Sequence, residues 1–274
     1  MKLGDKDMDD KIWIDKFIQL FSNYQLREAF TLKEAKIPSK LYIYARINEN
    51  TCFNLQNNTM YAQTPILFND PYDCITKIRY GEYLNTKYNK SDIDTEEYKE
   101  LKKAVVSEAQ ILEDKIKEFV LNDLRIICLT PHWNNMLMWS HYADSYKGIC
   151  IEYDWSSLAT DDFFRIRVFP VKYSNAFRDY TFDYNKINGY KTLAALYKSD
   201  CWNYENEWRV VFTDKEIYNG NYIMKMPRIS KIILGSRISN TDKAMIINYA
   251  NKLMCDITQI ELSKDEYKLE EMSI

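Results

Sequence analysis

The chain has few of the residues that mark common nucleotide and hydrolase sites. Its 274 residues include six glycines, six prolines and only two histidines, His132 and His141. It contains neither a GxGxxG nor a GxxxxGK[ST] stretch, which excludes the usual Rossmann and P-loop modes of nucleotide binding, and it has no GxSxG nucleophile elbow. Its six cysteines form no CxxC pair, so zinc-site spacing is absent and a disulfide framework is not expected.

The chain also has no net excess of positive charge and no long apolar run. The net charge is −3, which gives no overall field that would attract nucleic acid. No apolar run reaches the length that spans a membrane, and the first ten residues, MKLGDKDMDD, lack the apolar core of a signal peptide. We therefore expect a cytoplasmic protein with no membrane partner.

Aromatic residues are abundant instead, with 22 Tyr, 12 Phe and 6 Trp. A tyrosine can fill a core and still present a hydroxyl, so this bias fits a groove that stacks a ring of a ligand. It also fits the Lys-, Asn- and Ile-rich composition of an AT-biased genome, which is the simpler explanation.

Hydrophobic periodicity predicts an α+β protein with no internal repeat. Strands are expected at 41–47, 60–65, 124–130, 148–154, 165–174, 206–213, 221–226, 231–235 and 256–262. Helices are expected at 8–36, 48–58, 92–122, 134–143, 187–201 and 241–253. We expect a helical extension at 1–38 that offers a packing or homo-oligomer surface, a single domain at 39–262 with a helical insertion near 92–122, and a tail at 263–274.

The densest run of reactive side chains is MLMWSHYADSYKGICIEYD, residues 136–154. It predicts a short helix with Trp139 packed inward, a turn at Gly148 and a core strand. Ser140 and His141 are adjacent on this helix and do not face each other, so they form no local catalytic pair. His141 and Tyr142 are the best candidates to reach a pocket; the alternative for His141 is a partly buried residue that caps the helix or binds a backbone carbonyl.

A second stretch, CWNYENEWRV at 201–210, contains two carboxylates. If Glu205 and Glu207 lie on a strand or its entry, both point to one side. A solvated strand edge explains such a pair simply. The flanking Trp202, Tyr204 and Trp208 favour a site, because a carboxylate beside aromatic rings can stabilise an oxocarbenium-like cation while the rings stack on a base.

The third candidate region lies near the start of the domain. Arg46 is expected on an otherwise apolar strand, where a guanidinium normally binds a protein carboxylate or a phosphate. Thr64 ends the next strand, before the turn FNDPYDC at 68–74, in which Asn69 or Asp70 can accept hydrogen bonds from backbone amides. A salt bridge from Arg46 to an acidic side chain is the simpler reading.

Taken in order, these stretches resemble a widespread bacterial and phage-associated family catalogued as a domain of unknown function. The resemblance covers about residues 40–240 and rests on FNDPxD, MWSHYAxxxxGxCIE and WxxExEWR in sequence. The family label implies no activity.

The chain also resembles, more weakly, the arginine-type ADP-ribosyltransferases, which have an arginine on the first strand, a Ser/Thr-rich second strand and a later Glu-x-Glu. This implies a mixed, mostly antiparallel split sheet with helical insertions. It implies NAD as the substrate, no metal, and a protein or nucleic acid as acceptor. Ala-Gln-Thr-Pro stands where that family has Ser-Thr-Ser, and the MWSHYA stretch has no counterpart there.

That resemblance assigns roles residue by residue. Arg46 would bind the pyrophosphate with Thr64 beside it, Glu207 would stabilise the oxocarbenium, and Glu205 would orient the acceptor. To these the residue chemistry adds His141 as a catalytic candidate. The candidates for stacking or contacting the nucleotide rings are Tyr61, Tyr72, Trp208 and Tyr142.

Two alternatives remain. A metal-dependent nuclease or phosphodiesterase would gather carboxylates and a histidine around a divalent cation, from Asp70, Asp73, His141, Glu152 and Glu205. A non-catalytic sensor or partner-binding module would use FNDPYD and MWSHYAD only as structural turns. The favoured hypothesis is an NAD-consuming transferase or glycohydrolase acting in phage defence or as a toxin.

Overall fold

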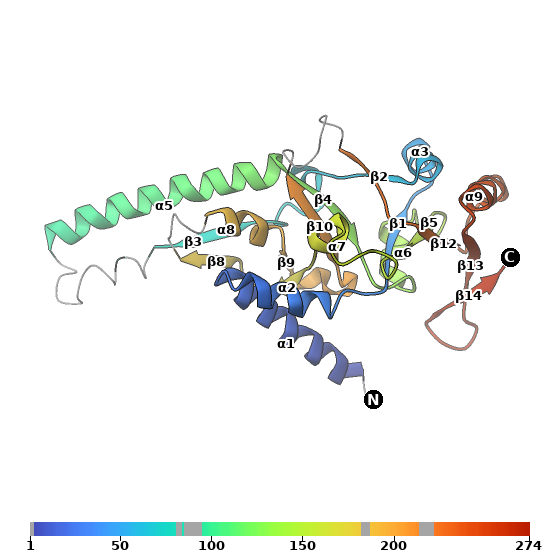
Figure 1. The fold of residues 1–274 in the computed structure, drawn as a ribbon, viewed down its shortest axis with the longest axis horizontal. Coiled ribbons are helices and arrows are strands. Elements are labelled where there is room, and N and C mark those ends of the chain that lie inside the picture. The colour runs from blue at the N-terminus through green and yellow to red at the C-terminus, as the bar shows by residue number, and fades with distance from the viewer. Residues whose placement is uncertain (1–2, 81–83, 85–94, 182–186, 214–221) are drawn as a thin grey trace. The chain divides into compact units, whose positions relative to one another are not determined.

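The computed structural model describes residues 3–80, 84, 95–181, 187–213 and 222–274 (Figure 1). Its backbone contacts divide the chain into two compact units, each assembled from three separate stretches. Unit 1 comprises Met1–Leu32, Thr64–Arg125 and Val171–Asp200, and unit 2 comprises Lys33–Gln63, Ile126–Pro170 and Cys201–Ile274. The domain ranges expected above follow sequence order, whereas these units interleave along the chain.

Unit 1 is built largely from helices. The expected helix at 8–36 is two helices, α1 (Leu3–Ser22) and α2 (Leu26–Glu34), because Tyr24 adopts a left-handed conformation with φ 59° between them. The apolar face of α1 packs within the unit, since Phe17 and Ile18 are buried and α1 contacts α8 (Ile187–Ala194). An oligomer formed through this helix stays a prediction.

The longest helix of unit 1 is α5 (Glu96–Asn122), as the Glu/Lys-rich stripe predicts. Thr95 caps its start by accepting a hydrogen bond from the Tyr98 amide, and the expected residues 92–94 lie outside the described part of the chain. Its buried side chains recur at three- and four-residue steps, which places them on one face; they are Val105, Ala109, Leu112, Ile116 and Val120.

Short strands complete unit 1. β3 (Thr76–Arg79) pairs with β8 (Arg178–Thr181), and β7 (Lys172–Ser174) pairs with β9 (Tyr197–Ser199), both in parallel. The helix expected at 187–201 therefore ends early, because Tyr197–Ser199 gain backbone partners from β7. The 3-10 turn η1 (Pro65–Leu67) begins at the last residue of the strand predicted at 60–65. Pro65 has no backbone N–H, so it cannot donate a hydrogen bond to a neighbouring strand.

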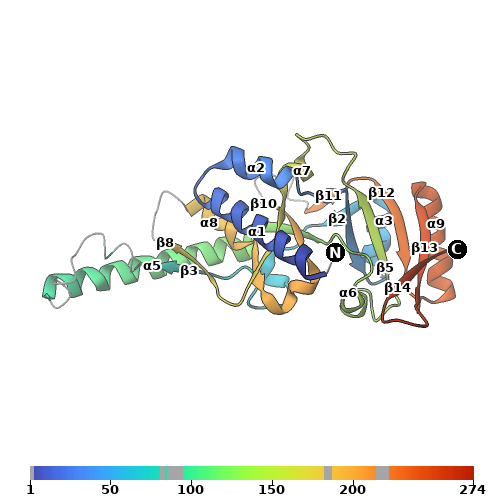
Figure 2. The same ribbon diagram turned by 90° about the horizontal axis from the view of Figure 1, so that it is seen from below.

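Unit 2 contains a five-stranded sheet in the order β1 (Lys40–Ala45), β5 (Ile149–Asp154), β12 (Ile229–Leu234), β13 (Asp256–Leu262) and β14 (Leu269–Ser273). Every neighbouring pair is antiparallel except β12 with β13. Helix α9 (Asn240–Leu253) joins these two parallel strands and runs alongside them (Figure 2). The expected tail at 263–274 is thus part of the sheet, because β14 pairs with β13.

A three-stranded sheet in the order β4 (Leu124–Leu129), β10 (Trp208–Thr213) and β6 (Val168–Pro170) accompanies it. β2 (Thr59–Tyr61) pairs with β11 (Ile223–Lys225), and α3 (Glu49–Asn57) precedes β2. The prediction of a single strand at 165–174 is wrong, because this range contains the end of a short helix and two separate strands, β6 and β7. Asp162 caps a short helix, α7 (Phe163–Arg167), before β6 begins.

Lys33 is buried at the end of α7 and donates to the carbonyls of Arg165 and Ile166, at 2.7 and 2.8 Å. These carbonyls lie in the last turn of the helix and need donors. Burial lowers the pKa of the Lys33 ammonium to about 7.

The α+β class is confirmed, since helices accompany mixed sheets in which antiparallel pairs predominate. The split sheet of an ADP-ribosyltransferase is not confirmed. Among the described residues, no helix combines the length and the apolar character needed to cross a membrane.

Candidate active site

The candidate site of unit 2 is built on α6 (Met136–His141), which is shorter than the expected helix at 134–143. Asn135 starts the helix: its side-chain oxygen accepts hydrogen bonds from the amides of Leu137 and Met138, at 3.0 and 3.2 Å. These amides have no partner inside the helix, so the cap fixes where α6 begins. His141 ends the helix, and Tyr142 follows it directly.

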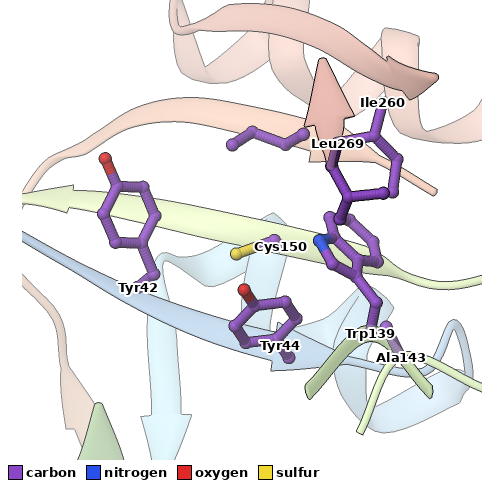
Figure 3. Packing of buried hydrophobic residues seen from close by; sticks show 8 residues of the cluster. Tyr42, Tyr44, Trp139, Ala143, Cys150, Ile260 and Leu269 are labelled. Carbon is purple, nitrogen blue, oxygen red and sulfur yellow. The ribbon is translucent and has the colours of Figure 1, made fainter. Parts of the chain in front are cut away.

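Trp139 anchors α6 to the five-stranded sheet, as expected. Its side chain is fully buried, and its indole nitrogen donates to the Trp133 carbonyl at 2.7 Å. Figure 3 shows Trp139 and Ala143 beside Tyr44 and Cys150 of the neighbouring strands. The rings of Tyr44 and Trp139 meet edge to face, with centroids 5.2 Å apart, an arrangement that aromatic quadrupoles favour. Because the helix is fixed by its buried face, its last residues have a defined position.

The turn after α6 is held in an unusual backbone conformation. Asp144, Ser145 and Tyr146 have φ values of 46°, 53° and 70°. Side chains other than glycine disfavour this region by about 1–2 kcal/mol each, so the surrounding structure must impose it. The Tyr146 amide donates to the Trp139 carbonyl, and the Tyr146 carbonyl accepts from the Arg237 amide.

The two glycines of the family-like motifs allow this turn to pack closely. A Cβ atom on Gly148 would lie 2.2 Å from the Ala45 carbonyl oxygen, and one on Gly235 would lie 2.1 Å from the Tyr146 carbonyl oxygen. No side chain fits against backbone atoms at these distances. The glycines in GxCIE and KIILG are therefore explained by the close approach of strands β1, β5 and β12 to the turn.

The second half of the site is the 3-10 helix η4 (Asp200–Glu205). The Asn135 side chain donates to the Tyr204 carbonyl at 2.6 Å, and the Thr130 hydroxyl donates to the Glu205 carbonyl at 2.7 Å. Asn206 then adopts a left-handed conformation, with φ 46°, before β10 begins. Two side chains from the region of α6 thus fix the end of η4.

Glu205 is the buried carboxylate of the site, with 3% of its surface exposed. It accepts a hydrogen bond from the Tyr142 hydroxyl at 2.5 Å, which is the short distance typical of a hydroxyl bound to a charged oxygen. Beside it, the Nδ1 atom of His141 lies 3.0 Å from the Tyr204 hydroxyl. The structure therefore brings together His141 and Tyr142 from one predicted stretch and Glu205 from another.

Both histidines of the chain contact residues that flank Glu205. His141 contacts Tyr204, and the Nε2 atom of His132 lies 3.0 Å from the Asn206 side-chain nitrogen. A neutral His132 accepts at Nε2 from this amide and carries its own proton on Nδ1. The interpretation of His141 as a cap or a ligand of a backbone carbonyl is replaced by a side-chain contact with a phenol.

Glu207 does not share this site, contrary to the expectation that both carboxylates point to one side. It accepts two hydrogen bonds from the guanidinium of Arg209, at 2.9 and 3.0 Å, and both side chains are buried within β10 and its entry. Glu205 ends a 3-10 turn and is not part of the strand, so the two-residue strand period does not apply across Asn206. Glu207 is therefore bonded to Arg209, whereas Glu205 is bonded to Tyr142.

The remaining candidates make other contacts within their own units. Arg46 follows β1 and is exposed, so it is not the strand guanidinium that was predicted; its carbonyl accepts from the Thr51 hydroxyl. Thr64 belongs to unit 1, where its hydroxyl donates to the Leu121 carbonyl, and Tyr72 of the same unit stacks on Phe177.

The other two ring candidates are in unit 2. Tyr61 lies on β2 and contacts Tyr222 edge to face, with ring centroids 6.2 Å apart. Trp208 is buried at the start of β10. A buried ring of this kind contributes to the core and has little surface on which a ligand can stack.

The side chains of the metal hypothesis belong to both units and have other partners. Asp70 accepts from the Tyr72 amide, as the turn prediction required, and Asp73 forms a buried ion pair with Lys198 in unit 1. Within the described residues, no group of three or more His, Cys, Asp or Glu side chains could hold a metal ion.

Glu152 of β5 is committed to the sheet. It accepts hydrogen bonds from Tyr42 and Ser230, at 2.8 Å each, and its oxygen lies 2.7 Å from the Lys40 ammonium. Burial by itself would raise the pKa of this carboxyl, but the bonds from Lys40, Ser230 and Tyr42 outweigh burial and hold it below its ordinary value.

Sequence reasoning missed the residues that hold the site together. Thr130, Asn135 and Asn206 are polar residues in loops, and their partners are 69 to 75 residues away along the chain. Tyr204 was noted only as a flanking ring. The available signal was the clustering of aromatic and acidic residues in WNYENEW, which marks the segment without specifying its partners.

Comparisons with curated proteins and with solved structures return no match. None of the comparisons supports the resemblance to ADP-ribosyltransferases. The resemblance to a family of unknown function is confirmed, over a shorter stretch than the residues 40–240 expected. The model of the family described as "Protein of unknown function (DUF2971)" matches residues 138–210, which run from α6 into β10 and include His141, Tyr142, Glu205 and Glu207.

Proposed function

We propose that the chain is an enzyme that cleaves the N-glycosidic bond of a nucleotide, with NAD as the substrate, and transfers the ADP-ribosyl group to water or to an acceptor. The observation that carries this proposal is the buried Glu205 carboxylate, bonded to Tyr142 at 2.5 Å beside the His141–Tyr204 contact. A fixed carboxylate next to partly exposed rings suits a reaction that develops positive charge on a sugar.

The steps follow from the charges. As the bond between C1′ and the nicotinamide nitrogen breaks, its electron pair leaves with the nitrogen and positive charge develops on the ribose. Glu205 stabilises this charge, and Tyr142 holds the carboxylate in place. Water or an acceptor hydroxyl then attacks C1′ and loses a proton, which the exposed ring of His141 accepts.

Consumption of NAD would take place in the cytoplasm, and it would make the chain toxic or protective against phage. A protein or nucleic acid is the acceptor class if the reaction is transfer. Among the alternatives, a partner-binding module predicts no turnover at all, so the same assay separates it from the enzyme.

The test is release of nicotinamide from NAD by the purified full chain, followed by chromatography with and without cell lysate as a source of acceptor. We expect release by the wild type and a loss of about 100-fold or more in Glu205→Gln. Glu207→Gln is the matched control, since the same change two residues away leaves the Tyr142–Glu205 contact intact. The soluble, folded fraction of the Glu207→Gln variant should release nicotinamide at the wild-type rate.

Circular dichroism and thermal unfolding must accompany each variant, because both glutamates are buried. The wild type is tested in two lysates, one from cells that tolerate its expression and one from cells that do not. If it releases no nicotinamide in either lysate, the proposal is contradicted. Equal activity of wild type and a folded Glu205→Gln variant would remove Glu205 from the mechanism.

A further inference from the structure

The rings around Glu205 form a continuous series, which we call the aromatic arc and define as Trp202, Tyr204, His141 and Tyr142. Successive ring centroids lie 6.1 Å, 6.1 Å and 6.2 Å apart. The planes of neighbouring rings are inclined by 40°, 68° and 82°, so the contacts are tilted or edge to face and are not parallel stacks.

All four rings retain contact with solvent, His141 most of all. A ring that served only the core would be covered like Trp139, which has no exposed surface. The arc is nevertheless held in place, since Asn135 fixes the Tyr204 backbone, and His141 and Tyr142 follow the anchored helix α6. The arc is therefore an ordered surface that offers aromatic groups to a ligand.

A buried carboxylate, Glu205, adjoins the arc. Tyr142, at one end of the arc, is bonded directly to the carboxylate of Glu205, and Glu205 is the residue next to Tyr204. Aromatic faces attract cations through their quadrupoles, and a buried carboxylate attracts them more strongly than an exposed one because water screens it less. Both contributions favour the same class of ligand.

We infer that the aromatic arc binds a flat organic cation whose charge is spread over a ring, such as an N-substituted pyridinium. A delocalised cation loses less hydration than an ammonium when it meets rings. Neutral rings of the same shape would gain the stacking but not the charge attraction. The identity of this cation as the nicotinamide ring of NAD rests on the proposed function, and it makes the site selective for the oxidised form over the uncharged reduced form.

The experiment is isothermal titration calorimetry of the full chain with 1-methylnicotinamide, a pyridinium cation methylated on the ring nitrogen that has no glycosidic bond to cleave, and with uncharged nicotinamide. We expect the cation to bind at least 10-fold more tightly than the neutral ring. Glu205→Gln should remove most of this difference and leave nicotinamide binding unchanged, whereas Trp202→Ala should weaken both.

Tyr267→Ala is the matched control, because Tyr267 is a fully exposed ring of the same unit far along the chain from the arc. It should change neither affinity. Equal binding of the two ligands by the wild type, or no binding of either at millimolar concentration, would overturn the inference without requiring any variant to fold.

The two proposals fail separately. If the cation binds selectively and NAD is not consumed, the site is a binding site and the proposed function is wrong. If NAD is consumed and the cation has no advantage, the enzyme holds nicotinamide elsewhere and the aromatic arc is not its binding site.

Discussion

Glu205 and Glu207 are two residues apart and equally buried, with 3% and 5% of their surfaces exposed, but they serve different parts of the molecule. Glu207 directly precedes β10 and is bonded to a cation on that strand, the fully buried Arg209. Glu205 is bonded to a neutral phenol, Tyr142, from another element. The first carboxylate completes the interior of the β4–β10–β6 sheet, and the second lies where partly exposed rings gather.

The Glu-x-Glu pattern alone therefore does not specify the position of its two side chains, because the backbone conformation between them decides where each one points. The residue between the two carboxylates, Asn206, is left-handed, and the chain changes there from a 3-10 turn to a strand. A buried guanidinium requires a carboxylate nearby, because an uncompensated buried charge is costly. Arg209 therefore determines which of the two glutamates is structural.

The largest effect is expected from breaking the structural pair. Arg209→Met leaves the Glu207 carboxylate buried without its guanidinium and should destabilise the chain by about 3–5 kcal/mol. The double variant Glu207→Leu with Arg209→Met should recover much of this loss, since it removes both charges. Urea unfolding followed by tryptophan fluorescence measures both; a single variant as stable as the wild type would show that the pair is not structural.

A smaller effect is expected at the other carboxylate. Tyr142→Phe removes one donor to a charged acceptor and should cost about 1.5–3 kcal/mol of stability, together with a fall in nicotinamide release. The matched control is Tyr146→Phe, which removes a hydroxyl that donates only to the Met136 carbonyl. It should cost about 0.5–1.5 kcal/mol, with turnover unchanged. Equal losses in the two variants would argue against a special role for Tyr142.

The turn that separates the two carboxylates gives an intermediate test. Asn206→Val places a β-branched side chain at φ 46° and should cost about 1–2 kcal/mol. Asn206→Gly accepts this φ and should cost less, although it loses the contact with His132. Thermal unfolding ranks the two variants, and a valine variant more stable than the glycine one would contradict the backbone argument.

The smallest effect concerns Glu152, a third buried carboxylate that is bonded to Lys40, Tyr42 and Ser230. Its pKa is lower in the folded chain than its ordinary value, so it binds fewer protons folded than unfolded, and its stabilisation is complete above the unfolded pKa. That stabilisation is lost as the pH falls through the folded pKa.

Lys40→Met should therefore move the midpoint of acid unfolding to higher pH. At neutral pH it should change stability by no more than about 1 kcal/mol, because Lys40 is half exposed. Acid titration of wild type and variant, followed by circular dichroism, checks the direction; a midpoint displaced to lower pH would contradict the sign.

Much of the secondary structure could be predicted, and the failures have identifiable causes. The helices at 96–122 and 240–253 and the strand at 149–154 follow periodic apolar patterns that local sequence contains in full. The region 165–174 failed because its apolar residues suit a strand and a buried helical turn alike, and the cap at Asp162 was not weighed. Residues 197–199 failed because only pairing with β7 makes them a strand.

Local sequence is enough to specify the Asn135–Trp139–His141 helix, the Gly148 turn, and a second segment rich in rings and carboxylates. The folding of the whole chain sets which of these residues come into contact. It brought Tyr142 to Glu205 across 63 residues of chain, gave Glu207 to Arg209, and left Arg46 outside. The reason is physical: helix and strand periods are set by neighbours along the chain, whereas a site is set by packing and by the need to give each buried charge a partner.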